Sequence, residues 1–287
     1  MLFLSLSILF STLNHLLFKA FPRFRIEVIT ALVVNYGVCV IIGYSSTFQI
    51  LIDQPIHHQD WFIYSIIQGA LLVTCLFLIA WTTEKQGVTV ASLASRLSVA
   101  LPTIAAFFLY GDLVTMAKIF GIIMALAAIF LNSIKPKNSL HTSAVISFLP
   151  ISLFIGFGLH SALMKHVQYS YLGDTTYHSY VMSSFLFAFL ISGAILIWRK
   201  LKENRKSNWK DIVAGLVLGC SNYGSVYFLI RALGIPGWES STIFPTQSVA
   251  IIIFSSLSAW QLFKEEIRKH LIIAIFIGTL SIILVNL

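Results

Sequence analysis

The sequence predicts an all-α integral membrane protein in which ten transmembrane helices form two inverted five-helix repeats. Its composition supports the membrane class: 57% of the 287 residues are hydrophobic and only 10% are charged, whereas soluble domains contain about 25% charged residues. So few charged side chains cannot cover the surface of a soluble protein of this size. The other two observations are the length of the apolar runs and a likeness between the two halves of the chain.

Ten apolar runs are long enough to span a membrane. About 20 helical residues cross the hydrocarbon core, and only helices or closed barrels satisfy their backbone hydrogen bonds there. The runs are too long for barrel strands. Because the first run lacks a preceding basic region and contains Asn14, we expect a retained span rather than a signal peptide. The predicted spans are about 2–20, 28–48, 61–83, 87–110, 113–132, 141–165, 176–198, 210–232, 239–262 and 270–286.

Basic residues favour the connections that follow odd-numbered spans. These connections hold 15 of the 19 Lys and Arg residues, the even-numbered ones and their edges hold three, and Arg96 lies inside a span. Cytoplasmic loops are rich in Lys and Arg, so we expect odd connections in the cytoplasm, both termini outside, and a location in a bacterial inner membrane. The same asymmetry explains the net charge of +8 without a nucleic-acid partner.

The two halves of the chain resemble each other at a nearly constant offset. An odd number of spans in each half makes the second copy enter the membrane in the opposite sense, which is the inverted-repeat plan of many secondary transporters. The sequence therefore predicts repeats at 1–135 and 136–287 within one membrane domain. The matching segments are LNHLLFK at 13–19 with LHSALMK at 159–165, FLIA at 77–80 with FLIR at 228–231, RLSVA at 96–100 with TQSVA at 246–250, and IFLN at 129–132 with ILVN at 283–286.

This plan resembles the EamA-type members of the drug/metabolite transporter superfamily, over essentially the whole chain. The resemblance implies helices around a central cavity, lined mainly by spans 1, 3, 4, 6, 8 and 9, and transport by alternating access. Efflux is the direction it favours. Arg96 is not part of the general pattern, and the acidic residue after span 4 is Asp rather than Glu. Besides the 5+5 spans, the matching features are Lys19, Lys165, Pro102, Asp112, and Glu265 or Glu266.

Arg96 is the first candidate for substrate binding. A guanidinium cannot lose its proton, and insertion scales put its cost at a span centre at about 2.5–3.5 kcal/mol. We expect Arg96 to hold an anionic group, such as the carboxylate of an amino acid or organic acid. Ser92, one turn earlier, would continue a small polar stripe. The alternative is a structural arginine that caps helix carbonyls or pairs with a buried acid.

Other polar and aromatic residues within the spans are further candidates for the substrate site. Ordinary packing between helices is the alternative for each. A histidine titrates near neutral pH, so His160 is also a candidate for coupling transport to protons. Gln247 lies beside the position that matches Arg96 in the second repeat. The remaining candidates are Asn14, Trp81, Tyr223 and Tyr227.

Three charged residues are candidate gates. Lys19 and Lys165 are related by the repeat and fall toward opposite sides of the membrane, although lysines near span ends also snorkel to the interface. Glu239 lies in GIPGWESSTIFPTQ at 234–247, where proline and glycine predict a broken or late-starting span. The alternative for Glu239 is an ion pair with Arg231.

The residues together favour a secondary transporter for a small organic metabolite. The partners expected are this solute and the lipid bilayer, with the chain a monomer or homodimer. No P-loop pattern occurs, and the three cysteines predict packing rather than a metal or cofactor site. One rival is an intramembrane enzyme, such as a lipid-group transferase with His15 and His160 as general bases. Against this rival, the sequence contains no HExxH motif and no cluster of acidic residues at catalytic spacing. A structural or sensory membrane protein is the other.

Overall fold

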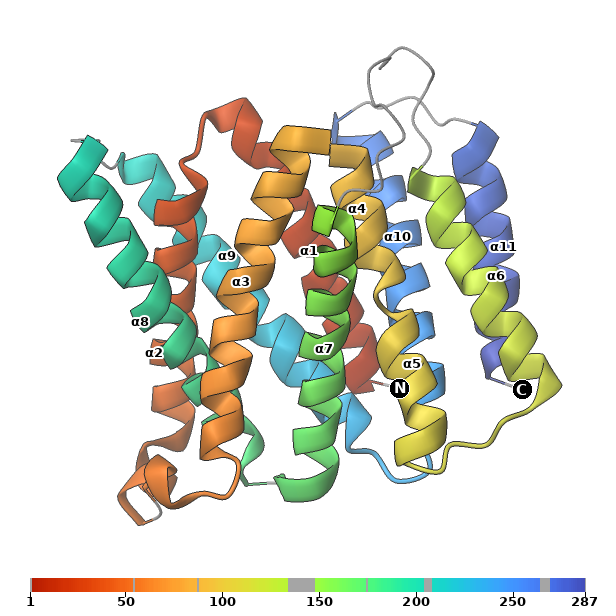
Figure 1. Cartoon of the computed structure of the whole chain (residues 1–287), viewed down its shortest axis with the longest axis horizontal. Coiled ribbons are helices and arrows are strands. Elements are labelled where there is room, and N and C mark those ends of the chain that lie inside the picture. The colour runs from red at the N-terminus through yellow and green to blue at the C-terminus, as the bar shows by residue number, and fades with distance from the viewer. Residues whose placement is uncertain are drawn as a thin grey trace. The chain divides into compact units, whose positions relative to one another are not determined.

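The computed structural model describes residues 2–53, 55–86, 88–133, 148–173, 175–203, 208–263 and 269–286. These residues form eleven α-helices and one short 3-10 helix, with no strand among them (Figure 1). The all-α prediction is thus confirmed. The helices are α1 (Leu2–Phe24), α2 (Val28–Asp53), η1 (Ile56–His58), α3 (Phe62–Gln86), α4 (Val88–Leu97), α5 (Ala100–Leu109), α6 (Met116–Ser133), α7 (Phe148–Tyr171), α8 (Tyr177–Glu203), α9 (Trp209–Leu233), α10 (Ser240–Phe263) and α11 (Lys269–Val285).

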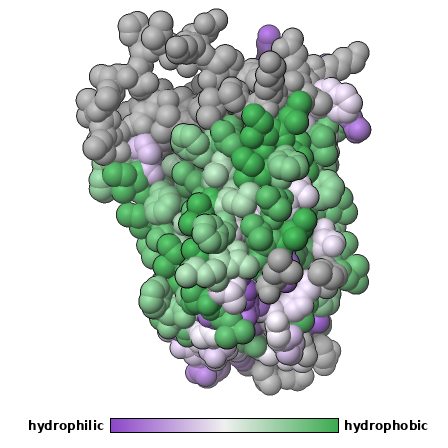
Figure 2. Space-filling model, turned by 90° about the vertical axis from the view of Figure 1, so that its right-hand side faces the viewer, coloured by the Kyte–Doolittle hydropathy of each residue, from purple (hydrophilic) through white to green (hydrophobic). Residues whose placement is uncertain are grey.

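Seven of the described helices are long and apolar enough to cross a membrane, namely α1, α2, α3, α7, α8, α9 and α10. Shorter apolar segments cover Ala94–Leu109, Met116–Leu131 and Ile272–Val285. Figure 2 shows the side that carries α6 and α11, where apolar side chains cover the middle of the face. Phe130 on α6 and Phe276 on α11 are 50% and 71% exposed. Such surfaces suit lipid rather than water, so the chain has the character of a multi-pass membrane protein.

The fourth predicted span is interrupted, because it consists of α4 and α5 separated at Ser98 and Val99. Pro102 explains the interruption. Proline lacks an N–H, and its ring clashes with the carbonyl four residues earlier, which is that of Ser98. The backbone tightens there: Val99 and Leu101 donate to the carbonyls of Arg96 and Ser98, each three residues back, at 3.4 and 3.0 Å.

The helices divide into two compact units. Unit 1 comprises Met1–Val73 and His166–Ile235, and unit 2 comprises Thr74–Lys165 and Pro236–Leu287. Each unit therefore takes segments from both halves of the sequence. The division into repeats at 1–135 and 136–287 describes sequence likeness rather than these units, and it stays a prediction.

In unit 1, α2 packs along α8 and α9, and two glycines of α9 allow the close approach of α2. A Cβ on Gly215 would lie 2.5 Å from the carbonyl oxygen of Ala31, and one on Gly219 would lie 2.6 Å from Cβ of Val38 and 2.8 Å from the carbonyl oxygen of Asn35. Small residues four positions apart commonly bring membrane helices together, because burial from water does not drive their association.

Gly219→Ala is therefore expected to destabilise the protein by about 1–3 kcal/mol, since overpacking of this kind forces the backbones apart. Thermal unfolding of the purified protein in detergent would measure the effect. Gly193 in α8 is the matched control, because nothing lies within 4 Å of a Cβ built there; Gly193→Ala should leave stability unchanged or slightly raised. Equal effects of the two substitutions would contradict close packing at Gly219.

Hydroxyl groups also join α1 to α9 in unit 1. Ser7 Oγ donates to the carbonyl of Ser225 at 2.9 Å, and the hydroxyls of Ser11 and Ser225 share a hydrogen bond of 2.6 Å. Ser221 Oγ donates to the carbonyl of Phe10 at 3.0 Å. Hydrogen bonds of this kind between membrane helices contribute modestly, about 0.6 kcal/mol each, and they set the rotation of α1 against α9.

In unit 2, α6 lies against α11, and α10 packs on α5, α6 and α11. Ser281 Oγ donates to the carbonyl of Gly121 at 2.8 Å, across the α6–α11 contact. A smaller apolar cluster joins α3, α4 and α7 through Ala91, Ala94 and Leu153. These contacts hold both halves of the interrupted fourth span within unit 2.

Candidate functional site

The candidate residues of the sequence fall into both units. Unit 1 holds Asn14, Lys19, Tyr223 and Tyr227. Unit 2 holds the larger group, which is Trp81, Ser92, Arg96, His160, Lys165, Glu239 and Gln247.

Arg96 lies in the last turn of α4, directly before the interruption at Ser98, and is half-buried. An α-helix turns by about 100° per residue, so Arg96 projects from a face roughly opposite that of Ala94, which packs on α7 and α3. A cation in the last turn also offsets the partial negative charge of the helix C-terminus. Ser92 belongs to α4, but its side chain lies outside the described part of the structure.

The other candidates of unit 2 differ in burial. Trp81 is 54% exposed on α3 and has the ring of Phe77 at 6.5 Å. His160 is half-buried on α7. Gln247 is buried on α10, at 7% exposure. Each of these residues is thus placed on a helix of the same unit as Arg96.

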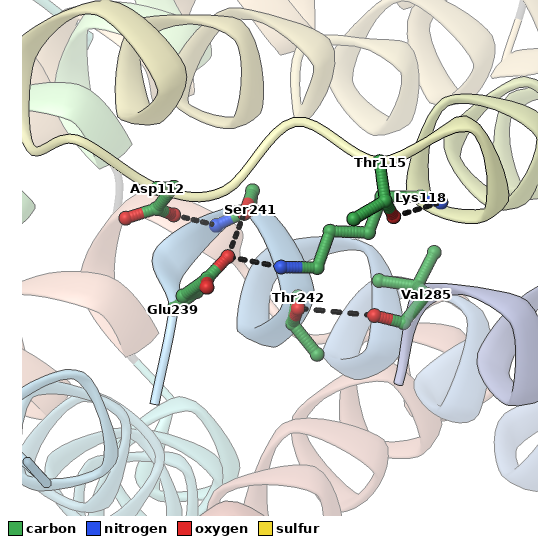
Figure 3. A network of polar contacts seen from close by, with 7 residues as sticks. All are labelled: Asp112, Thr115, Lys118, Glu239, Ser241, Thr242 and Val285. Atoms are coloured by element: carbon green, nitrogen blue, oxygen red, sulfur yellow. Dashed lines mark hydrogen bonds and ion pairs between the residues drawn. The ribbon is translucent and has the colours of Figure 1, made fainter. Parts of the chain in front are cut away.

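Glu239 takes part in a polar network at the start of α10 (Figure 3). Its carboxylate forms an ion pair with the Lys118 ammonium of α6 and accepts from Ser241 Oγ at 3.3 Å. The backbone N–H of Ser241 donates to Oδ2 of Asp112 at 2.7 Å. The N–H groups in the first turn of a helix have no acceptor within the helix. Asp112 supplies an acceptor for one of these groups at the start of α10. The network fastens the α5–α6 connection to α10.

The structure bears on two expectations about this region. Glu239 pairs with Lys118 of unit 2, because the first turn of α10 faces the start of α6. The span that carries Pro245 starts late, at Ser240, as predicted, but α10 is not broken at Pro245. The interruption lies in the fourth predicted span, before Pro102.

The two repeat-related lysines have different surroundings. Lys165 is buried, at 6% exposure, and its ammonium lies 5.4 Å from the centroid of the Tyr110 ring. Lys19 is exposed on α1. A desolvated ammonium gains from the negative face of an aromatic ring, so Lys165 contacts the protein rather than simply reaching an interface. Exposure of Lys19 suits a snorkelling side chain.

Tyr223 and Tyr227 lie together in unit 1, beside His178, which was not among the candidates from the sequence. The two rings stack with an interplanar angle of 10° and centroids 6.0 Å apart. His178 of α8 stacks on Tyr227 at 3.9 Å, and its Nδ1 lies 2.6 Å from the hydroxyl oxygen of Tyr223. His178 arrives from another helix, so no spacing in the sequence could reveal it.

Asn14 is half-buried on α1, and its Oδ1 is buried without a hydrogen-bond partner among the described residues. Thr12 lies two residues earlier and is 6% exposed, and its hydroxyl is also buried without a hydrogen-bond partner among the described residues. A buried acceptor without a donor costs about 1–3 kcal/mol. Residues two positions apart on a helix point about 200° away from each other, so Thr12 and Asn14 face different sides of α1.

Two acidic side chains of unit 1, Asp211 and Glu27, accept hydrogen bonds from backbone N–H groups. Asp211 accepts from the N–H groups of Glu27 and Asn208 at 2.8 and 3.0 Å, and Glu27 accepts from the N–H of Thr30 at 2.7 Å. These carboxylates cap the N-termini of α2 and α9. Across the described ranges, no three His, Cys, Asp or Glu side chains gather in a way that could hold a metal ion.

Comparisons with known proteins support the fold. No family model matches this sequence. The chain is 24% identical over 204 residues to a Haemophilus influenzae protein described as uncharacterized, covering 70% of this chain and 67% of that protein. It also resembles a protein solved by crystallography with a TM-score of 0.75 and 13% identity, over 99% of this chain and 94% of the other. At this identity the likeness concerns the fold alone.

Proposed function

We propose that the protein is a secondary transporter that moves a small organic anion or zwitterion, such as an organic acid or amino acid, by alternating access. The observation that carries this proposal is Arg96 beside the interruption between α4 and α5. Charged residues inside membrane-spanning segments are costly and usually mark a solute or ion pathway. Interrupted helices at the membrane midplane often form the substrate sites of transporters.

The finer architecture belongs to the same proposal. We propose ten spans in two inverted repeats around a central cavity, of the EamA type in the drug/metabolite transporter superfamily, and export as the direction. Seven long apolar helices and three shorter apolar segments support the count of spans. In this proposal the chain carries out no chemical conversion, and His160 is the candidate for proton coupling.

Transport across a sealed bilayer tests the proposal. A thermal-stability screen of the purified protein against amino acids, organic acids, nucleosides, sugars and cationic drugs would first find a solute that binds, since a ligand stabilises the folded state by mass action. Reconstituted vesicles should then move this solute in a protein-dependent manner. Conversion of the solute by protein in detergent, without any flux in vesicles, would instead support an intramembrane enzyme.

We also propose an inner-membrane location with both termini outside, on the basis of the loop charges. A C-terminal phosphatase fusion should be active and a C-terminal fluorescent fusion dark. Cytoplasmic reporter activity would reverse the orientation.

A further inference from the structure

A second arginine, in unit 1, lies among aromatic rings. Tyr223, Tyr227 and Arg231 follow one another at four-residue spacing, so they line one face of α9. The guanidinium carbon of Arg231 lies 5.0 Å from the centroid of the Phe3 ring and 5.2 Å from that of Tyr177. Since Phe3 belongs to α1 and Tyr177 to α8, three helices of unit 1 meet at this cation.

One turn away from Arg231 the rings form a flat stack. His178 lies on Tyr227 with an interplanar angle of 23°, and Tyr223 is nearly parallel to Tyr227. The hydrogen bond between His178 and the Tyr223 hydroxyl holds the stack in place. Tyr223 is buried, whereas His178 and Tyr227 are only half-buried, so ring surface remains accessible beside the half-buried cation.

We infer that this group, made of Tyr177, His178, Tyr223, Tyr227 and Arg231, is a subsite for an aromatic carboxylate. An arginine fork binds a carboxylate through two parallel N–H donors, and parallel rings offer a stacking surface for a planar group. A solute with both groups would use the cation and the stack together. The inference rests on the proposed function, and it names the substrate class of a site separate from Arg96.

A purely structural role of Arg231 would require only its positive charge, whereas carboxylate binding requires its planar guanidinium. Arg231 lies in the last turn of α9, where any cation offsets the helix dipole. Lysine would serve that role equally well, but a lysine cannot form the bidentate contact. Arg231→Lys should therefore keep the stability of the free protein and lose most of the affinity for a carboxylate.

Three small probes separate charge from planarity. Benzoate has the ring and the carboxylate, benzamide has a planar ring without charge, and cyclohexanecarboxylate has the charge without planarity. The full-length protein purified in detergent would be titrated with each probe, and the shift in its unfolding temperature recorded. For the wild type we expect benzoate to bind more tightly than either of the other two.

The variants then assign each preference to a residue. Arg231→Gln and Arg231→Lys should weaken benzoate binding by roughly tenfold or more, the value of a charge-assisted contact, with little effect on benzamide. Tyr227→Leu should remove the preference for benzoate over cyclohexanecarboxylate, and Tyr227→Phe should retain it. Lys202→Gln is the matched control, because Lys202 also lies over a ring, that of Trp198, at 4.3 Å but outside the subsite.

Several results would overturn the inference. One is the lack of any wild-type shift with millimolar benzoate; another is an equal loss in Lys202→Gln and Arg231→Gln. A loss in Arg96→Gln with none in Arg231→Gln would place the carboxylate in unit 2 and leave the proposed function standing. Benzoate binding through Arg231 in a protein that moves no solute across vesicles would keep the subsite and reject the transporter.

Discussion

Arg96→Ala is expected to abolish transport while the protein still folds. If Arg96 binds the anionic group of the solute, its loss removes charge-assisted hydrogen bonds in a site of low polarity, and flux should fall by roughly tenfold or more. Removal of an arginine from a membrane-spanning segment also removes an insertion cost of about 2.5–3.5 kcal/mol. We therefore expect the variant to insert in the membrane and to fold with a stability near that of the wild type.

Flux in vesicles and thermal unfolding in detergent would be measured on the same protein preparation. Arg23→Ala is the control, because Arg23 is exposed near the end of α1 and should affect neither quantity. Arg96→Lys keeps the charge without the planar fork, so it should fold like the wild type and retain only part of the flux. A parallel loss of folded protein and flux in Arg96→Ala would assign Arg96 to the C-terminus of α4 as a structural cation.

The two arginines proposed to bind anions belong to different units. Arg96 belongs to unit 2 and Arg231 to unit 1, and each lies in the last turn of a helix. Alternating access requires that a solute meet different contacts as one part of a transporter moves against another.

The helices follow from the sequence because their causes are local. Apolar runs of about 20 residues predict spans, and α1, α2 and α9 lie within a few residues of the predicted ranges. The interruption of the fourth span is local too: Pro102 displaces the hydrogen bond of Ser98, yet a long apolar run with one proline also suits a continuous, kinked helix. Hydropathy alone does not distinguish these outcomes.

The partners of the charged residues depend on packing between distant segments. Lys118 and Glu239 are 121 residues apart, and nothing in either local pattern points to the other. Arg231, the alternative partner that the sequence offers for Glu239, is closer in sequence and belongs to unit 1. By contrast, the four-residue spacing of Tyr223, Tyr227 and Arg231 indicates that they share a face of α9. The other two members of the subsite, Tyr177 and His178, lie on α8, and no local pattern links them to this face.

Glu239→Gln is expected to have the largest effect on stability. Lys118 is nearly buried, with 9% of its side chain exposed, and Glu239 has 24% exposed. Loss of one partner from a buried pair costs about 3–5 kcal/mol, because the remaining charge stays desolvated. Partial exposure of Glu239 puts the expected loss near the lower end of this range. Thermal unfolding of the purified protein would measure it.

A double-mutant cycle separates the pair from its surroundings. Lys118→Met should lower the free energy of unfolding less than Glu239→Gln does. In Lys118→Met, the Glu239 carboxylate still accepts a hydrogen bond from the Ser241 hydroxyl. In Glu239→Gln, the Lys118 ammonium stays nearly buried without its carboxylate partner. The double variant removes both charges, so its loss should be smaller than the sum of the two single losses by more than about 1 kcal/mol. Asp112→Asn is the comparison within the network: it weakens the acceptor for the N–H of Ser241 and should cost about 1 kcal/mol. Strictly additive losses would mean that Lys118 and Glu239 are neighbours without a stabilising ion pair, and that α10 is held to α6 by apolar packing alone.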